Sequence, residues 1–204
     1  MLFDVDGVLL DSFEANLRFY QNLLIKAGYT PPTEKDFLTL THFPLVKVVK
    51  ELTHATDAET ERIYILAKDF GEELYPHNLL KTPEYTYEVI KKLHKTYKLG
   101  IVTSRIKEGI YTVPQLALLQ NYFQVAVGFE DTVNHKPHPD PLLFAAKNLN
   151  INLNEIVYIG DAESDVIAAR AAGMKVILFA KENFAEADAY TDSFKNLPEI
   201  IKKL

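Results

Sequence analysis

The 204-residue sequence contains no cysteine. A disulfide framework, a thiolate zinc site and a cysteine nucleophile are therefore excluded, and any nucleophile must be an oxygen or a nitrogen. Long apolar runs are also lacking, since the stretch at 176–180 is among the longest and is far too short to span a membrane. Basic runs do not extend beyond pairs such as Lys91-Lys92, and the formal net charge is −6. These features argue against nucleic-acid and membrane partners.

Targeting signals are missing as well. The segment Met1-Leu2-Phe3-Asp4 has neither a basic region nor an apolar core of signal-peptide length. No Asn-x-Ser/Thr glycosylation acceptor occurs in the sequence. We therefore expect a cytoplasmic protein, and the apolar fraction of 48% is ordinary for a packed globular domain.

Short β-rich runs alternate with stretches of helical periodicity. The runs that read as buried strands lie at 2–5, 99–103, 125–128, 156–159 and 175–179. Helical patterns lie between them at 90–97, 141–148 and 164–172. This alternation predicts an α/β fold with a doubly wound, mostly parallel, Rossmann-like sheet.

A long segment separates the first two predicted strands, which end near Asp6 and begin near Leu99. Its apolar residues recur at helical spacing, first at Leu17, Tyr20, Leu24 and Ala27 and later at Ile63, Leu66, Phe70 and Leu74. Turn-forming residues at 28–32 and 43–44 separate these helices. We therefore expect a small α-helical subdomain at 13–82, inserted into a core made of 1–12 and 83–204.

Two acidic segments follow predicted strands. Asp4 and Asp6 come directly after the first strand, and Asp161 and Asp165 follow the strand at 156–159. Each segment alone also fits a simpler interpretation, as a solvated turn or as a helix N-cap. Because the carboxyl ends of parallel strands meet at one edge of a sheet, the four acids together call for a cation. Oxygen-only ligands select a hard ion, so we expect Mg²⁺ together with a substrate phosphate.

Groups that could bind a phosphate occur at the same predicted edge. Thr103 and Ser104 follow the second strand and offer a hydroxyl and backbone N–H donors. Lys136 lies in a loop that prolines stiffen at 137, 139 and 141. A threonine or a lysine at such a place is uninformative by itself, and only the combination indicates a phosphate site.

Taken in order, these segments resemble the haloacid dehalogenase superfamily of phosphohydrolases over nearly the whole chain. The resemblance rests on the segments 4–12, Thr103, 136–141 and 160–165, with a further similar run at 168–173. The insertion at 13–82 is similar to the helical cap of the subgroup that includes phosphoglycolate phosphatases and β-phosphoglucomutases. The resemblance therefore implies an α/β core carrying a helical cap.

The resemblance also implies a role for each acid. Asp4 would be the nucleophile that forms an aspartyl-phosphate, and Asp6 would be the general acid and base. Mg²⁺ would be held by the Asp4 carboxylate, the Asp6 backbone carbonyl and Asp161. Asp165 would orient Lys136 or a metal-bound water.

For the phosphate itself, the resemblance implies binding by the Thr103 hydroxyl and the Ser104 N–H. Lys136 would offset the charge that develops in the transition state. These groups complete the predicted site.

The resemblance implies an Mg²⁺-dependent phosphatase that hydrolyses a small phosphorylated metabolite. Dehalogenases of the family lack a carboxylate at the position of Asp6, so its presence favours phosphate esters. Phosphoglucomutases of this cap type carry a histidine where this chain has Asn16. A phosphomutase is therefore the second hypothesis, and a catalytically silent binding protein that kept the fold is the third.

Overall fold

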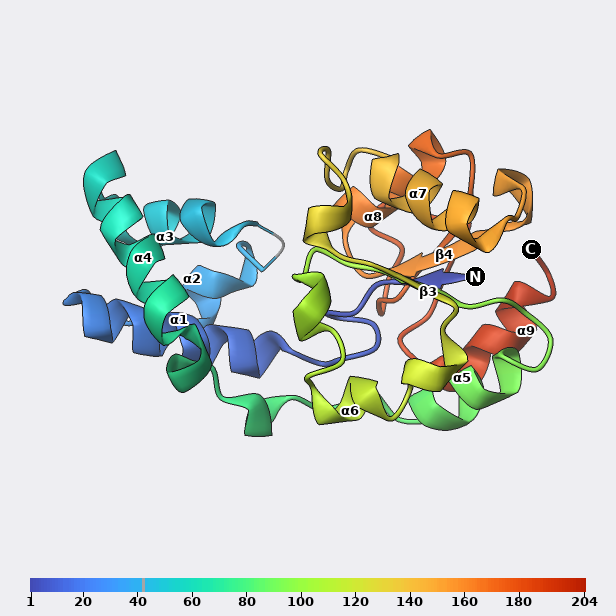
Figure 1. Ribbon diagram of the computed structural model, residues 1–204, viewed down its shortest axis with the longest axis horizontal. Coiled ribbons are helices and arrows are strands. Elements are labelled where there is room, and N and C mark those ends of the chain that lie inside the picture. The colour runs from blue at the N-terminus through green and yellow to red at the C-terminus, as the bar shows by residue number, and fades with distance from the viewer. Residues whose placement is uncertain (42) are drawn as a thin grey trace. The chain divides into compact units, whose positions relative to one another are not determined.

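The computed structural model describes residues 1–41 and 43–204. They form two compact units, one made of Met1–Asp11 and Lys81–Leu204 and the other of Ser12–Leu80. Figure 1 shows the larger unit built around a sheet and the smaller one built from helices. In the described chain, no helix is both long and apolar enough to cross a membrane.

The larger unit contains one parallel six-stranded sheet in the order β3-β2-β1-β4-β5-β6. Its strands are β1 (Leu2–Phe3), β2 (Gly100–Val102), β3 (Val125–Val127), β4 (Val157–Gly160), β5 (Lys175–Leu178) and β6 (Ala189–Tyr190). The predicted α/β fold is confirmed. The strand β6 was not predicted, because neither of its two residues is buried, in contrast to the two buried residues of β1.

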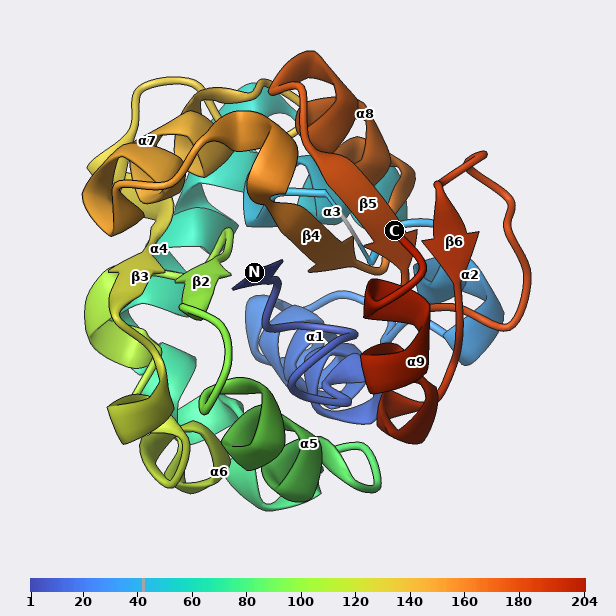
Figure 2. The same cartoon turned by 90° about the vertical axis from the view of Figure 1, so that its right-hand side faces the viewer.

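Helices cover both faces of this sheet. They are α5 (Thr86–Leu93), α6 (Pro114–Ala117), α7 (Asp140–Leu149), α8 (Glu163–Ala171) and α9 (Leu197–Ile201). Short 3₁₀ turns lie at η2 (Lys107–Gly109), η3 (Gln120–Tyr122), η4 (Phe129–Asp131), η5 (Leu153–Glu155) and η6 (Phe194–Asn196). Figure 2 shows α7 and α8 on one face and α5 and α9 on the other. Crossover helices on both faces are the arrangement that a doubly wound parallel sheet requires.

The core of the larger unit follows from the two-residue period of its strands. Leu2, Tyr158 and Val176 lie in register on β1, β4 and β5 and belong to one buried cluster with residues of α7 and α8. The next residue along β1, Phe3, faces the other side and stacks on Phe194 with ring centroids 6.5 Å apart. A two-residue strand is stable here because β2 and β4 pair with it on both sides.

The same topology positions the polar residues. In a parallel sheet all carboxyl ends lie at one edge. Asp4 follows β1 directly, Thr103 follows β2 and Asp161 follows β4. Because β1 lies between β2 and β4, these three residues leave neighbouring strands at the same edge.

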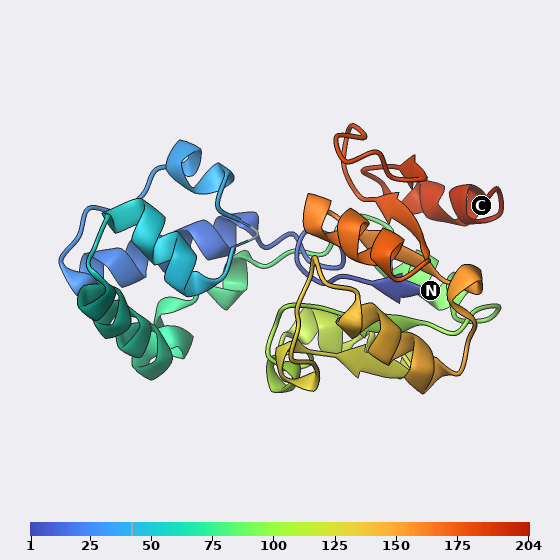
Figure 3. The same ribbon diagram turned by 90° about the horizontal axis from the view of Figure 1, so that it is seen from above.

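The smaller unit is helical in the part that the structure describes. Its helices are α1 (Phe13–Ala27), α2 (Glu34–Leu38), α3 (Leu45–Thr53) and α4 (Asp57–Leu74), followed by the 3₁₀ turn η1 (His77–Leu79). Figure 3 shows these helices gathered into one bundle. They pack around a buried cluster of their own, which includes Leu24, Phe37 and Ile63. The two helical patterns read from the sequence correspond to α1 and α4.

Candidate active site

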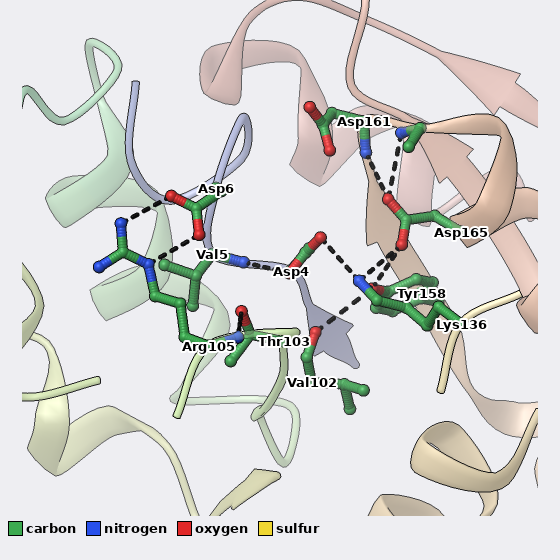
Figure 4. A network of polar contacts seen from close by, with 11 residues as sticks. Asp4, Val5, Asp6, Val102, Thr103, Arg105, Lys136, Tyr158, Asp161 and Asp165 are labelled. Carbon is green, nitrogen blue, oxygen red and sulfur yellow. Dashed lines mark hydrogen bonds and ion pairs between the residues drawn. The ribbon is translucent and has the colours of Figure 1, made fainter. Parts of the chain in front are cut away.

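Asp4 is held in place at the end of β1. Its backbone N–H donates to the carbonyl of Ile159 on the neighbouring strand at 2.9 Å. Its Oδ1 atom accepts a 2.7 Å hydrogen bond from the N–H of Val5. The residue is only 8% exposed, and burial raises the pKa of its carboxyl to about 6, although Lys136 opposes this shift. One oxygen of Asp4 is thus fixed by the backbone, and the other faces Lys136 (Figure 4).

Lys136 joins two acids from different parts of the chain. Its Nζ atom lies 2.7 Å from Asp4 Oδ2, 2.7 Å from Asp165 Oδ1 and 2.9 Å from the hydroxyl of Tyr158. Burial alone would lower the pKa of Lys136, but the carboxylates of Asp165 and Asp4 outweigh it and the pKa lies well above its ordinary value. Lys136 therefore stays charged and neutralises part of the acidic cluster.

Asp165 uses both carboxylate oxygens within the protein. Oδ2 accepts from the backbone N–H groups of Asp161 at 3.0 Å and Ala162 at 3.1 Å, so it caps the N-terminus of α8. Oδ1 accepts from Tyr158 at 3.1 Å and pairs with Lys136. A side chain at Gly160 would collide with this arrangement, since its Cβ would lie 2.4 Å from that of Asp165. Asp165 is thus a fixed anchor for Lys136.

Asp161 directly follows β4. Of the four acidic side chains at this edge, its carboxylate has the fewest hydrogen-bond partners. Among the residues that the structure describes, none donates a hydrogen bond to its side-chain oxygens. Burial, together with the charges of Asp4 and Asp165, raises its pKa well above the ordinary value. A cation beside this carboxylate would therefore favour its charged form.

The donor set fits a hard divalent cation. Asp4, Asp161 and Asp165 each offer one carboxylate oxygen, and these three atoms lie within 4.8 Å of one another. Each oxygen of Asp165 already has two partners, whereas each oxygen of Asp4 has one, so Asp4 and Asp161 are the two carboxylates with the most room for a cation. Oxygen ligands without nitrogen or sulfur suit Mg²⁺.

Asp6 has a partner that the sequence did not reveal. Its carboxylate accepts from Nε and Nη2 of Arg105, both at 2.7 Å, in a two-pronged ion pair (Figure 4). The following turn is closed by the N–H of Gly7, which donates to the carbonyl of Leu10 at 2.8 Å. Arg105 thus holds the Asp6 carboxylate. The group of Asp6 that remains for a metal is its backbone carbonyl, as the family resemblance implies.

The two residues predicted to bind phosphate after β2 differ in exposure. Thr103 is buried, and its hydroxyl accepts from the N–H of Arg105 at 3.2 Å. Ser104 is exposed. Both lie at the sheet edge that carries Asp4, and their role toward phosphate stays a prediction.

Two residues of this network were not predicted. Arg105 directly follows Thr103 and Ser104 in the sequence, where nothing in the pattern assigns it a role. Tyr158 lies within a predicted strand and is the only polar side chain in the segment Val157–Gly160. A fully buried hydroxyl needs a hydrogen-bond partner, and that requirement was the available signal.

Comparisons with known proteins relate this chain to a known family. Residues 1–179 match the family model described as haloacid dehalogenase-like hydrolase. The pyrophosphatase PpaX of Bacillus pumilus (strain SAFR-032) is 29% identical over 177 residues, which cover 86% of this chain and 80% of that protein. A putative pyrophosphatase PpaX of Caldanaerobacter subterraneus subsp. tengcongensis is 30% identical over 213 residues, covering 99% of this chain and 94% of that protein.

Solved structures share the fold. A haloacid dehalogenase-superfamily hydrolase of subfamily IA from Geobacter sulfurreducens has a TM-score of 0.77 and 27% identity, and the match covers 98% of this chain and 94% of that one. A putative phosphoglycolate phosphatase from Lactobacillus plantarum has a TM-score of 0.85 at 21% identity, covering 98% and 97% of the two chains. The second similarity concerns the fold alone.

Proposed function

This chain belongs to the haloacid dehalogenase-like hydrolase family, and from that membership we propose that it is an Mg²⁺-dependent phosphatase acting on a small phosphorylated metabolite. Membership in the family supports the hydrolysis of phosphate compounds. Beyond it, we propose the aspartyl-phosphate route, the metal and the roles of the residues. We also propose a cytoplasmic location.

The observation that carries the proposal is the environment of Asp4. This carboxylate is buried at the carboxyl end of the central strand, faces Lys136 at 2.7 Å and lies in one cluster with Asp161. A fixed carboxylate beside a buried cation is suited to attack an anionic phosphorus centre, since the cation offsets the repulsion between the two anions.

In the proposed reaction, an oxygen of Asp4 forms a bond to phosphorus while the bond from phosphorus to the leaving oxygen breaks. Asp6 would give a proton to that leaving oxygen and later take one from the water that hydrolyses the aspartyl-phosphate. For the first of these steps its carboxylate must leave Arg105 and be protonated, since both of its oxygens accept from that guanidinium here. Lys136 and the Thr103 hydroxyl bind the phosphoryl oxygens, with the Ser104 N–H beside them. Mg²⁺, held by Asp4, Asp161 and the Asp6 carbonyl, would neutralise negative charge on the nucleophile and the phosphate.

The helical unit Ser12–Leu80 is proposed to be the cap of the enzyme. By resemblance to the family, it would exclude water during the phosphoryl transfer and supply substrate specificity. Its helical content and its separate buried cluster support an independent subdomain.

The first experiment is a phosphate-release assay with a generic aryl phosphate and a panel of metabolites. The panel contains pyrophosphate, because relatives are named pyrophosphatases, together with phosphoglycolate, sugar phosphates and nucleotides. We expect turnover that EDTA removes and Mg²⁺ restores, and turnover that Asp4→Asn abolishes. The variant Asp192→Asn, at an exposed position, serves as the control.

Two outcomes would contradict the proposal. Full activity of Asp4→Asn would remove the assigned nucleophile. Conversion of a sugar 1-phosphate to its 6-phosphate without net phosphate release would favour the phosphomutase instead.

A further inference from the structure

A stacked pair of aromatic rings lies next to the loop that carries Lys136. The rings of His135 and Phe129 have centroids 3.9 Å apart and planes inclined by only 17°. Phe129 is 44% exposed, and His135 is half-buried. Neither the family resemblance nor the proposed reaction gives this pair a task, although His135 directly precedes Lys136 in the chain.

The segment that carries Lys136 needs contacts to hold it in place. The described segment 132–139 connects η4 to α7 without a helix or a strand of its own. Such a loop samples many conformations unless side chains restrain it. The ammonium of Lys136, however, lies 2.7 Å from two different carboxylates. On one side the loop is tied to the first turn of α7, where the amide of Asn134 donates to Asp140 at 2.9 Å. The stack provides a tie on the other side.

Phe129 is itself anchored to the loop after β2. Its N–H donates to the carbonyl of Arg105 at 2.8 Å. Two residues further along the chain, the carboxylate of Asp131 pairs with Lys107 of the same loop at 2.9 Å. Phe129 is therefore a fixed partner, and the ring of His135 that stacks on it is fixed as well.

The stack thus joins the two loops that supply the proposed phosphate-binding groups. The loop after β2 carries Thr103 and Ser104, and the loop after β3 carries Lys136. In the view of Figure 4, Thr103 and Lys136 lie on different sides of Asp4. Since both must contact one phosphoryl group, a shift of about 1 Å between the two loops would reduce the rate by up to about a hundredfold.

We propose that His135 is a positioning residue, which holds the loop of Lys136 against the loop after β2 through its stack on Phe129. The ammonium is thereby placed to bind the phosphoryl group during its transfer. The inference rests on the proposed function, which gives Lys136 that role. Because the contribution comes from the contact between two flat rings, a phenyl ring at position 135 should serve as well as the imidazole.

The test removes each ring in turn and measures kcat and KM with Mg²⁺ and the generic aryl phosphate. His135→Ala and Phe129→Ala each remove the stack, whereas His135→Phe keeps a flat ring at the same place. The double variant of His135→Ala and Phe129→Ala completes a double-mutant cycle. Phe144→Ala is the control, because Phe144 lies on α7 in the same unit and is similarly exposed, at 38%.

We expect His135→Ala and Phe129→Ala each to lower kcat about tenfold and to change KM less than about threefold, because Lys136 is proposed to act mainly in the transition state. The Mg²⁺ concentration for half-maximal activity should stay within about twofold of the wild type, since neither Asp4 nor Asp161 lies on the stacked loop. The double variant should lose no more than either single variant, because both changes remove the same contact. His135→Phe should keep at least about half of the wild-type kcat, and Phe144→Ala should behave as the wild type.

Wild-type kcat in His135→Ala would overturn the inference, because the stack would then only cover the surface. Equal losses in His135→Ala and His135→Phe would overturn it too, since the imidazole itself would be needed. Losses that multiply in the double variant would show that the two rings act separately and would also contradict it. Failure of the proposed function has a different signature, since the wild type would then release no phosphate, or Asp4→Asn would retain activity. Circular dichroism shows that the variants compared are folded.

Discussion

The ammonium group of Lys136 lies 2.7 Å from the Oδ2 atom of Asp4, although 132 positions separate the two residues in the chain. The contact closes a network in which Lys136 also pairs with Asp165. All three side chains are nearly inaccessible to solvent, so the ion pairs are not screened as surface pairs are. The stability of the larger unit and the proposed chemistry therefore depend on the same lysine.

Replacement of Lys136 by methionine removes the cation and keeps most of the side-chain volume. Two buried carboxylates are then left uncompensated, and we expect the free energy of unfolding to fall by about 3 kcal/mol. Urea denaturation measures this change, with Lys147→Met on the exposed face of α7 as the control. Mg²⁺ should raise the unfolding midpoint of Lys136→Met more than that of the wild type, because the cation replaces part of the lost positive charge. Equal stability of the two variants would contradict this prediction.

Asp161→Asn should have opposite effects on stability and on metal binding. The pKa of Asp161 is raised because its charge is buried near Asp4 and Asp165. In EDTA the neutral amide removes this repulsion, so the melting temperature should rise. With Mg²⁺ the lost ligand should raise the metal concentration for half-maximal activity by at least about tenfold. Thermal melts in EDTA test the expected rise in melting temperature, and an Mg²⁺ titration of activity tests the expected loss of metal affinity. An unchanged titration midpoint would contradict the assignment of Asp161 as a metal ligand.

Much of the fold could be predicted from the sequence because its signals are local. The five strands other than β6 are short apolar runs, and the acidic segments follow two of them directly, so the parallel topology alone brings Asp4 and Asp161 to one edge. The strand β6 carries no such signal, since its two residues, Ala189 and Tyr190, are partly exposed and give no alternation to read.

The pairing of side chains could not be predicted in the same way. Arg105 and Asp6 are 99 positions apart, and only the paths of both loops bring the guanidinium to the carboxylate. Tyr158 looks like any aromatic strand residue until its hydroxyl is found between Lys136 and Asp165. Such contacts depend on side-chain direction at the sheet edge, which a periodic pattern does not specify.

Tyr158→Phe tests whether the hydroxyl positions Lys136. The hydroxyl accepts from Lys136 at 2.9 Å and donates to Asp165 at 3.1 Å in a fully buried site. Its removal should lower the free energy of unfolding by about 1 to 2 kcal/mol and reduce kcat by about tenfold with a smaller change in KM. Tyr190→Phe, at an exposed position, is the control. A loss of stability without any change in kcat would limit Tyr158 to a structural role.

Gly7 offers the sharpest test of the geometry around Asp161, because the chain contains a matched control. Gly7 and Gly173 both belong to the larger unit and have positive φ angles of 74° and 72°. A Cβ on Gly173 would meet no atom within 4 Å, whereas a Cβ on Gly7 would lie 1.8 Å from Oδ2 of Asp161. Alanine therefore imposes similar backbone strain at both sites but displaces a proposed metal ligand only at Gly7.

We expect Gly173→Ala to destabilise the protein by about 1 kcal/mol and to leave the Mg²⁺ dependence of activity unchanged. Gly7→Ala should cost at least as much stability and, in addition, shift the Mg²⁺ titration to higher concentration, because the Asp161 carboxylate must leave its observed position. Thermal melts and Mg²⁺ titrations of the two variants separate the shared strain from the steric effect. Identical titrations would show that the Asp161 carboxylate does not have to occupy its observed position for the metal to bind.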